Sequence, residues 1–111
     1  MKLKEIVKKL NLSELTKIED KDINGVFISD MLSDVMGSAK PADLWLTVQT
    51  HKNIVSAANL VDIGAVVVTH NKKVPKDTIE LANRFNVIIL SSDLSTFDIV
   101  SKLIEIGLKP K

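Results

Sequence analysis

The segment Leu44–Leu60, LWLTVQTHKNIVSAANL, contains both a predicted strand and the start of a predicted helix. Leu44–Val48 is almost entirely apolar, which is typical of a buried strand. A polar turn, Thr50–Asn53, follows this strand. Beyond the turn, apolar residues recur at the spacing of an amphipathic helix, namely Ile54, Ala57, Ala58 and Val61. This order of strand, turn and helix is the repeating unit of a parallel α/β fold.

The same unit recurs on both sides of this segment. We predict a buried strand at Gly25–Ile28 and further strands at Ala65–Val68 and Val87–Leu90, each followed by a helical pattern. The last two strands are apolar on both faces, as central strands of a parallel sheet are. Short connections between such elements imply right-handed crossovers, with helices on both faces of one sheet. The fold class is therefore α/β: a small three-layer α/β/α sandwich with a mostly parallel sheet of four to five strands.

Glycines, a proline and a capping motif delimit the predicted helices. Met31–Met36 is a short helix that ends at Gly37, and Gly64 either ends the next helix or opens the following strand. Pro75 suits the first turn of a helix. Ser95–Asp98 has the Ser-x-x-Asp form of a capping box, and Gly107 is the expected C-cap of the last helix. Side chains expected to pack inward are Met31, Met36, Trp45, Ile79, Ala82, Phe85, Phe97, Val100, Leu103 and Ile104.

Residues 1–22 form the N-terminal part of the predicted domain. Leu3, Ile6, Val7 and Leu10 follow helical spacing, and Asn11 is a reasonable end for this helix. A possible edge strand lies at Leu15–Ile18 and precedes an acidic turn. The 111 residues contain no Pro- or Ser-rich linker, so we expect one domain over residues 1–111.

The composition excludes several classes of protein. The net charge of +1 gives no attraction to nucleic acid or to an anionic membrane. Cysteine is absent, which excludes disulfides, thiolate catalysis and cysteine-based metal sites. The apolar runs are too short to span a bilayer, and the N-terminus lacks the features of a signal peptide. We therefore expect a cytoplasmic protein.

Motifs for common chemistries are missing, and we assign no catalytic residue. The sequence has neither a phosphate-binding Gly-x-x-x-x-Gly-Lys loop, nor Gly-x-Gly-x-x-Gly, nor Gly-x-Ser-x-Gly. A metal site of Asp30, His51, His70 and Asp93, or a relay of His51, Asp93 and Ser91, can be drawn, but no motif places these residues together. A helix-turn-helix near the N-terminus is disfavoured, because Ser13–Asp22 is acidic. We expect neither a metal nor a cofactor.

Polar residues follow every predicted strand. In open parallel sheets, ligands bind beyond the carboxyl ends of the strands. Helix capping accounts for Asn53 and Ser95, and for Asp30 in part, but it does not require His51, His70 or the nearby Lys52 and Lys72. We therefore predict a site for a small anion, such as a nucleotide or a phosphorylated metabolite. Its residues are Ser29, Asp30, Thr50, His51, Asn53, His70 and Ser92.

Several segments resemble the DRTGG domain family. They are Gly25–Gly37, Asp43–Thr47, Asn53–Val55 and Leu90–Phe97. The chain is similar to short stand-alone DRTGG proteins that are often encoded near iron-only hydrogenase genes, and to the N-terminal domain of HPr kinase/phosphorylase. Asp22–Val26 keeps an Asp and one Gly of the name-giving motif, while its Arg, Thr and second Gly are missing.

The resemblance implies a non-catalytic regulatory domain that dimerises or binds a small regulatory molecule. It also suggests a protein partner in hydrogenase or acetyl-phosphate metabolism. The alternative is a protein-docking or dimerisation module with no small-molecule ligand. A third possibility is a small enzyme that uses His51 as a general base. The sequence names neither the ligand nor the partner.

Overall fold

The structure, a computed structural model, describes residues 1–110. These residues form five helices and five strands. In chain order they are α1 (Leu3–Leu10), β1 (Ser13–Glu14), β2 (Gly25–Ile28), α2 (Leu32–Ser38), β3 (Asp43–Thr47), α3 (Asn53–Val61), β4 (Ala65–Val68), α4 (Lys76–Arg84), β5 (Ile89–Ser91) and α5 (Thr96–Glu105). None of the helices within this range is long and apolar enough to cross a membrane.

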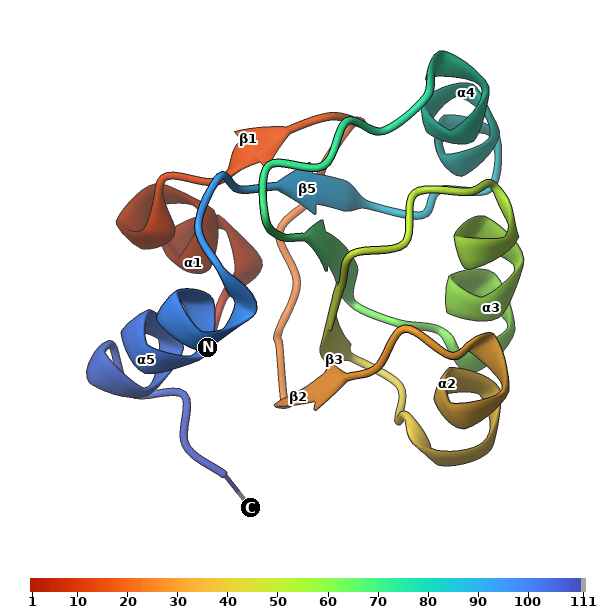
Figure 1. The fold of residues 1–111 in the computed structure, drawn as a ribbon. Helices are drawn as coiled ribbons and strands as arrows, with labels where there is room; N and C mark the ends of the chain where they lie inside the picture. The colour runs from red at the N-terminus through yellow and green to blue at the C-terminus, as the bar shows by residue number, and fades with distance from the viewer. Residues whose placement is uncertain (111) are drawn as a thin grey trace.

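The strands form one sheet in the order β1-β5-β4-β3-β2 (Figure 1). Strands β2 to β5 are parallel, and β1 is antiparallel to β5. The predicted α/β class is confirmed, with five strands. The N-terminal edge strand lies at Ser13–Glu14 and not at the predicted Leu15–Ile18. The ladder ends after Glu14 because the Thr16 hydroxyl, not a backbone carbonyl, accepts the Ile89 N–H at 3.0 Å.

The central strands β3 and β4 are buried along their whole length. Alternate residues point to opposite faces, so Leu44 and Val67 join one apolar core while Trp45 and Val66 join the other. Trp45 is fully buried, as predicted, and its indole Nε1 donates to the Ser29 carbonyl at 2.8 Å. A sheet with two apolar faces is stable in water only when helices cover both of them.

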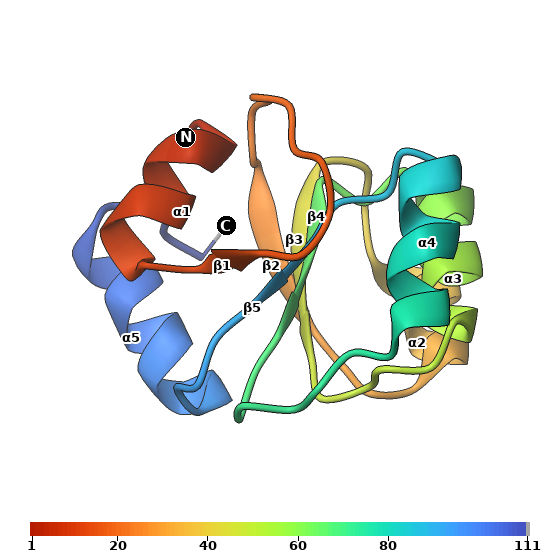
Figure 2. The ribbon, with the colours of Figure 1, turned by 90° about the horizontal axis from the view of Figure 1, so that it is seen from above.

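The two helical layers differ in width. Helices α1 and α5 lie on one face of the sheet, and α2, α3 and α4 lie on the other (Figure 2). A helix is about 10 Å wide and strands are about 4.8 Å apart, so one helix covers about two strands. Three helices therefore cover five strands, whereas two helices leave the β2 end of their face open. Val26 and Ile28 are accordingly 36% and 53% exposed, and the predicted burial of this strand is wrong.

Five side chains expected to pack inward are exposed instead. They are Met31, Met36, Phe85, Phe97 and Ile104. Phe85 is the C-cap of α4, just before the chain returns to the sheet at β5. Met31 precedes α2 as its N-cap, and Met36 lies on the outward side of that helix. Phe97 and Ile104 belong to α5, where Ile99 and Leu103 are the buried residues.

The glycines have different roles. Helix α2 continues through Gly37 to Ser38, so Gly37 does not end it. The C-cap of α5 is Ile106 and not the predicted Gly107, which follows it at a φ of +109°. Helix α3 ends at Asp62 in the left-handed conformation, before Gly64. The Gly64 N–H donates to the Asp43 carbonyl at 2.8 Å. A Cβ at Gly64 would lie 2.6 Å from Ile23 Cδ1 and 3.2 Å from two backbone oxygens.

We expect Gly64→Ala to destabilise the protein by about 1–3 kcal/mol, because the added methyl group overpacks a site bounded by backbone. Gly37→Ala is the matched control, since a Cβ there has no heavy atom within 4 Å. In a helix this second change should stabilise by about 0.5–1 kcal/mol. Urea unfolding of both variants measures the difference. Equal effects of the two substitutions would contradict the close approach at Gly64.

Candidate ligand-binding edge

The four parallel strands all end on the same side of the sheet. We call this side the carboxyl edge. It comprises residues 29–30 after β2, 48–53 after β3, 69–73 after β4 and 92–93 after β5. The predicted arrangement, in which Asp30, His51, His70 and Ser92 follow adjacent parallel strands, is therefore present. The order of strands places Asp30 at one end of the edge and Ser92 toward the other.

Asp30 joins the ends of β2 and β3. Its carboxylate Oδ1 accepts from the Thr47 hydroxyl at 2.8 Å and from the Val48 N–H at 2.9 Å. The Gln49 side-chain amide also donates to the Asp30 carbonyl at 3.2 Å. Asp30 is therefore not the cap of α2, because its carboxylate is directed to the neighbouring strand. Ser29 accepts the Met31 N–H at 3.0 Å and so shapes the turn into α2.

His51 provides the capping interaction of α3. Its Nδ1 accepts from the Asn53 N–H at 3.1 Å, and Asn53 is the first helical residue. We predicted that Asn53 caps this helix and that capping does not account for His51. Both predictions are wrong, because the His51 ring accepts the N–H of Asn53. Thr50 has a separate structural role, because its carbonyl accepts from the Thr78 hydroxyl of α4 at 2.9 Å.

His70 ties the end of β4 to the start of α5. Its ring Nε2 accepts from the Thr96 N–H at 3.2 Å, while the backbone N–H of His70 donates to the Leu94 carbonyl at 2.8 Å. His70 and Asn71 both have positive φ, which directs the chain toward the β5–α5 turn. Ser92 is held in the same turn, since its hydroxyl accepts the Leu94 N–H at 3.1 Å. Ser95 caps α5 through the Asp98 N–H, as predicted.

The predicted site residues thus form separate hydrogen-bonded groups along the edge. Ser29 and Asp30 belong to the β2–β3 end, whereas His70 and Ser92 belong to the β4–β5 end. Within residues 1–110, no three His, Asp or Glu side chains converge to hold a metal ion. The two histidines cap helices on opposite faces of the sheet, as the positions of α3 and α5 in Figure 2 show.

The capping bonds also fix which ring nitrogen of each histidine carries a proton. A neutral imidazole that accepts through one nitrogen bears its N–H on the other. His51 therefore presents Nε2–H and His70 presents Nδ1–H, and both side chains are exposed. Lys52, Lys72 and Lys73 are also exposed on this edge. The arrangement offers hydrogen-bond donors and positive charge to an anion.

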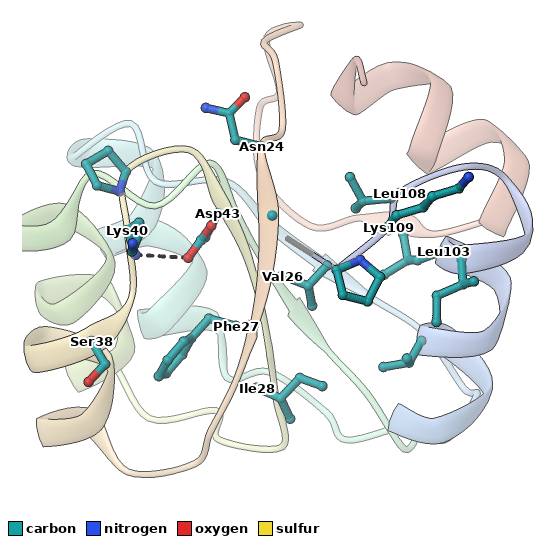
Figure 3. Close-up of a pocket in the computed structure, with 15 residues that line it drawn as sticks. Asn24, Val26, Phe27, Ile28, Ser38, Lys40, Asp43, Leu103, Leu108 and Lys109 are labelled. Atoms are coloured by element: carbon teal, nitrogen blue, oxygen red, sulfur yellow. Dashed lines mark hydrogen bonds between the residues drawn. The ribbon is translucent and has the colours of Figure 1, made fainter.

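A cavity that was not predicted lies away from this edge. It has a volume of about 630 Å³ and runs along β2, between that strand and α5 (Figure 3). Its apolar lining includes Val26, Ile28 and Ile104, and Lys40 and Lys109 lie near the amino end of β2. The remnant of the DRTGG motif reaches this cavity at Asn24 and Gly25. The apolar spacing of α5 is the sequence signal for this cavity, and the same spacing predicts core positions.

Comparisons with known proteins agree with this fold. The family model for the HPr serine kinase N terminus matches residues 45–106. The crystal structure of the CBS and DRTGG domains of the regulatory region of Clostridium perfringens pyrophosphatase, complexed with the activator diadenosine tetraphosphate, is similar with a TM-score of 0.70. The two sequences are 16% identical over 92% of this chain and 45% of that one, so this chain spans less than half of it. No curated protein sequence matches the chain.

We expect Asp30→Ala to destabilise the protein by about 1–2 kcal/mol, because Thr47 and Val48 lose their shared acceptor. Asp93→Ala removes an exposed carboxylate from the same edge and should change stability by less than about 0.5 kcal/mol. Chemical denaturation of both variants provides the measurement. A neutral effect of Asp30→Ala would show that this link between β2 and β3 adds no stability.

Proposed function

The chain belongs to the HPr serine kinase N-terminal domain family, and on this basis we propose that it is a regulatory domain that binds a small anionic ligand at the carboxyl edge. The ligand class is a nucleotide or a phosphorylated metabolite. The binding residues we assign are those predicted from the sequence, with His51 and His70 as the principal donors. The domain itself carries out no reaction under this proposal.

The observation that carries the proposal is the pair of oriented histidine N–H groups. Each is fixed by a capping bond to a helix N-terminus, so its direction is set before any ligand arrives. Preorganised donors bind an anion without the cost of ordering flexible side chains. The N-termini of α3 and α5 add the positive end of the helix dipole on both sides of the sheet.

The charges on this edge also support an anionic ligand. Lys52, Lys72 and Lys73 are exposed and can reach a phosphate without loss of packing. Asp30, which follows β2, is directed toward Thr47 and Val48 by two hydrogen bonds to its Oδ1. The similar pyrophosphatase region was crystallised with a nucleotide activator, which makes nucleotides the first ligands to test.

A small enzyme with His51 as its general base fits the geometry poorly. The lone pair of Nδ1 is used by the Asn53 N–H, and Nε2 carries the proton in this tautomer. Neither nitrogen is available to take a proton from a substrate while the cap is in place. A partner from hydrogenase or acetyl-phosphate metabolism stays a prediction.

Thermal unfolding with a panel of ligands tests the proposal. The panel contains ATP, ADP, AMP, diadenosine tetraphosphate, acetyl phosphate and inorganic phosphate. A specific ligand at about 100-fold its Kd should stabilise the domain by about 2.7 kcal/mol. The absence of stabilisation by any member would count against an anion site.

The double variant His51→Asp/His70→Glu is expected to abolish that stabilisation. Its carboxylates can occupy the positions of Nδ1 and Nε2 and keep the capping acceptors, while both N–H donors are lost. The unfolding free energy without ligand should therefore change little. Arg84→Glu, at the opposite end of the domain on α4, is the control with the same change in net charge. Undiminished binding by the double variant would place the ligand elsewhere.

A further inference from the structure

The open end of the α1/α5 face has an apolar surface that residues 1–110 leave exposed. It consists of Val26 and Ile28 on β2 and of Phe97, Val100 and Ile104 on α5, and we call it the β2 surface. Phe97 is 80% and Ile104 47% exposed. The three α5 residues recur at helical spacing and so lie on one side of the helix. Val26, Ile28, Val100 and Ile104 all line the cavity in Figure 3.

The two edges of the sheet are protected to different degrees. At the far edge, β1 has two residues and carries Glu14, and short charged edges of this kind resist further pairing. Strand β2 pairs with β3 alone within residues 1–110, and it contains neither a charged residue nor a proline. The backbone on its outer side is therefore open to another strand. Natural proteins seldom leave such an edge uncovered.

We propose that a second copy of this chain covers the β2 surface, with the two β2 strands paired antiparallel about a two-fold axis perpendicular to the sheet. The pairing joins two five-stranded sheets into one continuous sheet. Such an axis keeps the two α5 helices on the same face. Phe97 and Ile104 of both copies then cover Val26 and Ile28, which the narrow helical layer of a single chain leaves open.

The charges around β2 favour a second copy in this antiparallel orientation. Lys40 and Lys109 flank the amino end of the strand, as Figure 3 shows. Asp30 and Asp34 follow its carboxyl end, and Asp34 is exposed. Antiparallel pairing brings each amino end beside the partner's carboxyl end, so lysines face carboxylates in two equivalent places. Parallel pairing would instead bring lysines beside lysines, which is unfavourable.

The size of this side of the molecule also suits a dimer of this kind. A stable interface buries about 800 Å² on each subunit, which is about one eighth of the 6301 Å² surface of this chain. The molecule measures 33 × 26 × 24 Å, so one side with an edge strand and a helix flank can supply that area. An interface of this type is isologous and closes as a dimer.

Sedimentation equilibrium of the intact chain tests the proposal. We expect a mass of twice 12.2 kDa for the unmodified protein and a single-chain mass for Val26→Lys, because a charge at the centre of the strand opposes pairing. Leu60→Lys is the matched control: Leu60 is 70% exposed on α3, away from β2, and its variant should remain a dimer. Circular dichroism checks that each variant is folded.

Charge reversal tests the orientation. Lys40→Glu should raise the dimer dissociation constant about threefold or more, because two lysine–carboxylate contacts become repulsive. Adding Asp34→Lys should restore dimerisation, since antiparallel pairing brings the two altered residues together. If the second change weakens the dimer further, the antiparallel arrangement is wrong.

Two results would overturn the proposed interface. One is a single-chain mass for the unmodified protein at concentrations up to about 1 mM, which would leave the surface to a different occupant. The other is a folded Val26→Lys variant that is still a dimer. The ligand proposal stands apart, because the thermal shift of monomeric Val26→Lys with the same panel reports on the carboxyl edge alone.

Discussion

The burial of β3 and β4 on both faces is the constraint on which the rest of this structure depends. Their side chains alternate between two apolar cores, so water must be excluded from both sides of the sheet. Helices that follow each strand provide that cover, and the crossovers they form make the strands parallel. The turns from β2, β3, β4 and β5 into their helices consequently lie on one edge, together with the predicted site residues.

A second constraint comes from the different widths of helices and strands. The face covered by three helices is complete, whereas the face covered by α1 and α5 stops short of β2. Val26, Ile28, Phe97 and Ile104 have the spacing of core residues, but the described chain leaves them between 36% and 80% exposed. The domain therefore has two distinct surfaces: a polar carboxyl edge with oriented donors, and an apolar side suited to another subunit.

The two histidines illustrate how capping and recognition can share one residue. Each ring satisfies a backbone N–H at the start of a helix, which is a structural role. The same bond leaves the other nitrogen as a donor of fixed direction toward solvent. His51 can therefore cap α3 through one ring nitrogen and contact a ligand through the other. Asp30 differs, because its carboxylate is directed toward the adjacent strand.

The sequence by itself determined the order of strands and helices, the parallel sheet and the edge on which the polar turns lie. These features follow from hydrophobic periodicity and short connections. Both signals depend only on the residues of one helix or strand, or of two consecutive ones. It did not determine that Asn53 is capped by His51, or that His70 reaches α5. Nor did it reveal that the described residues leave Phe97 and Ile104 of α5 exposed. Only the tertiary structure decided these points, because each depends on how far one element extends relative to another, and residue spacing carries no information about that distance.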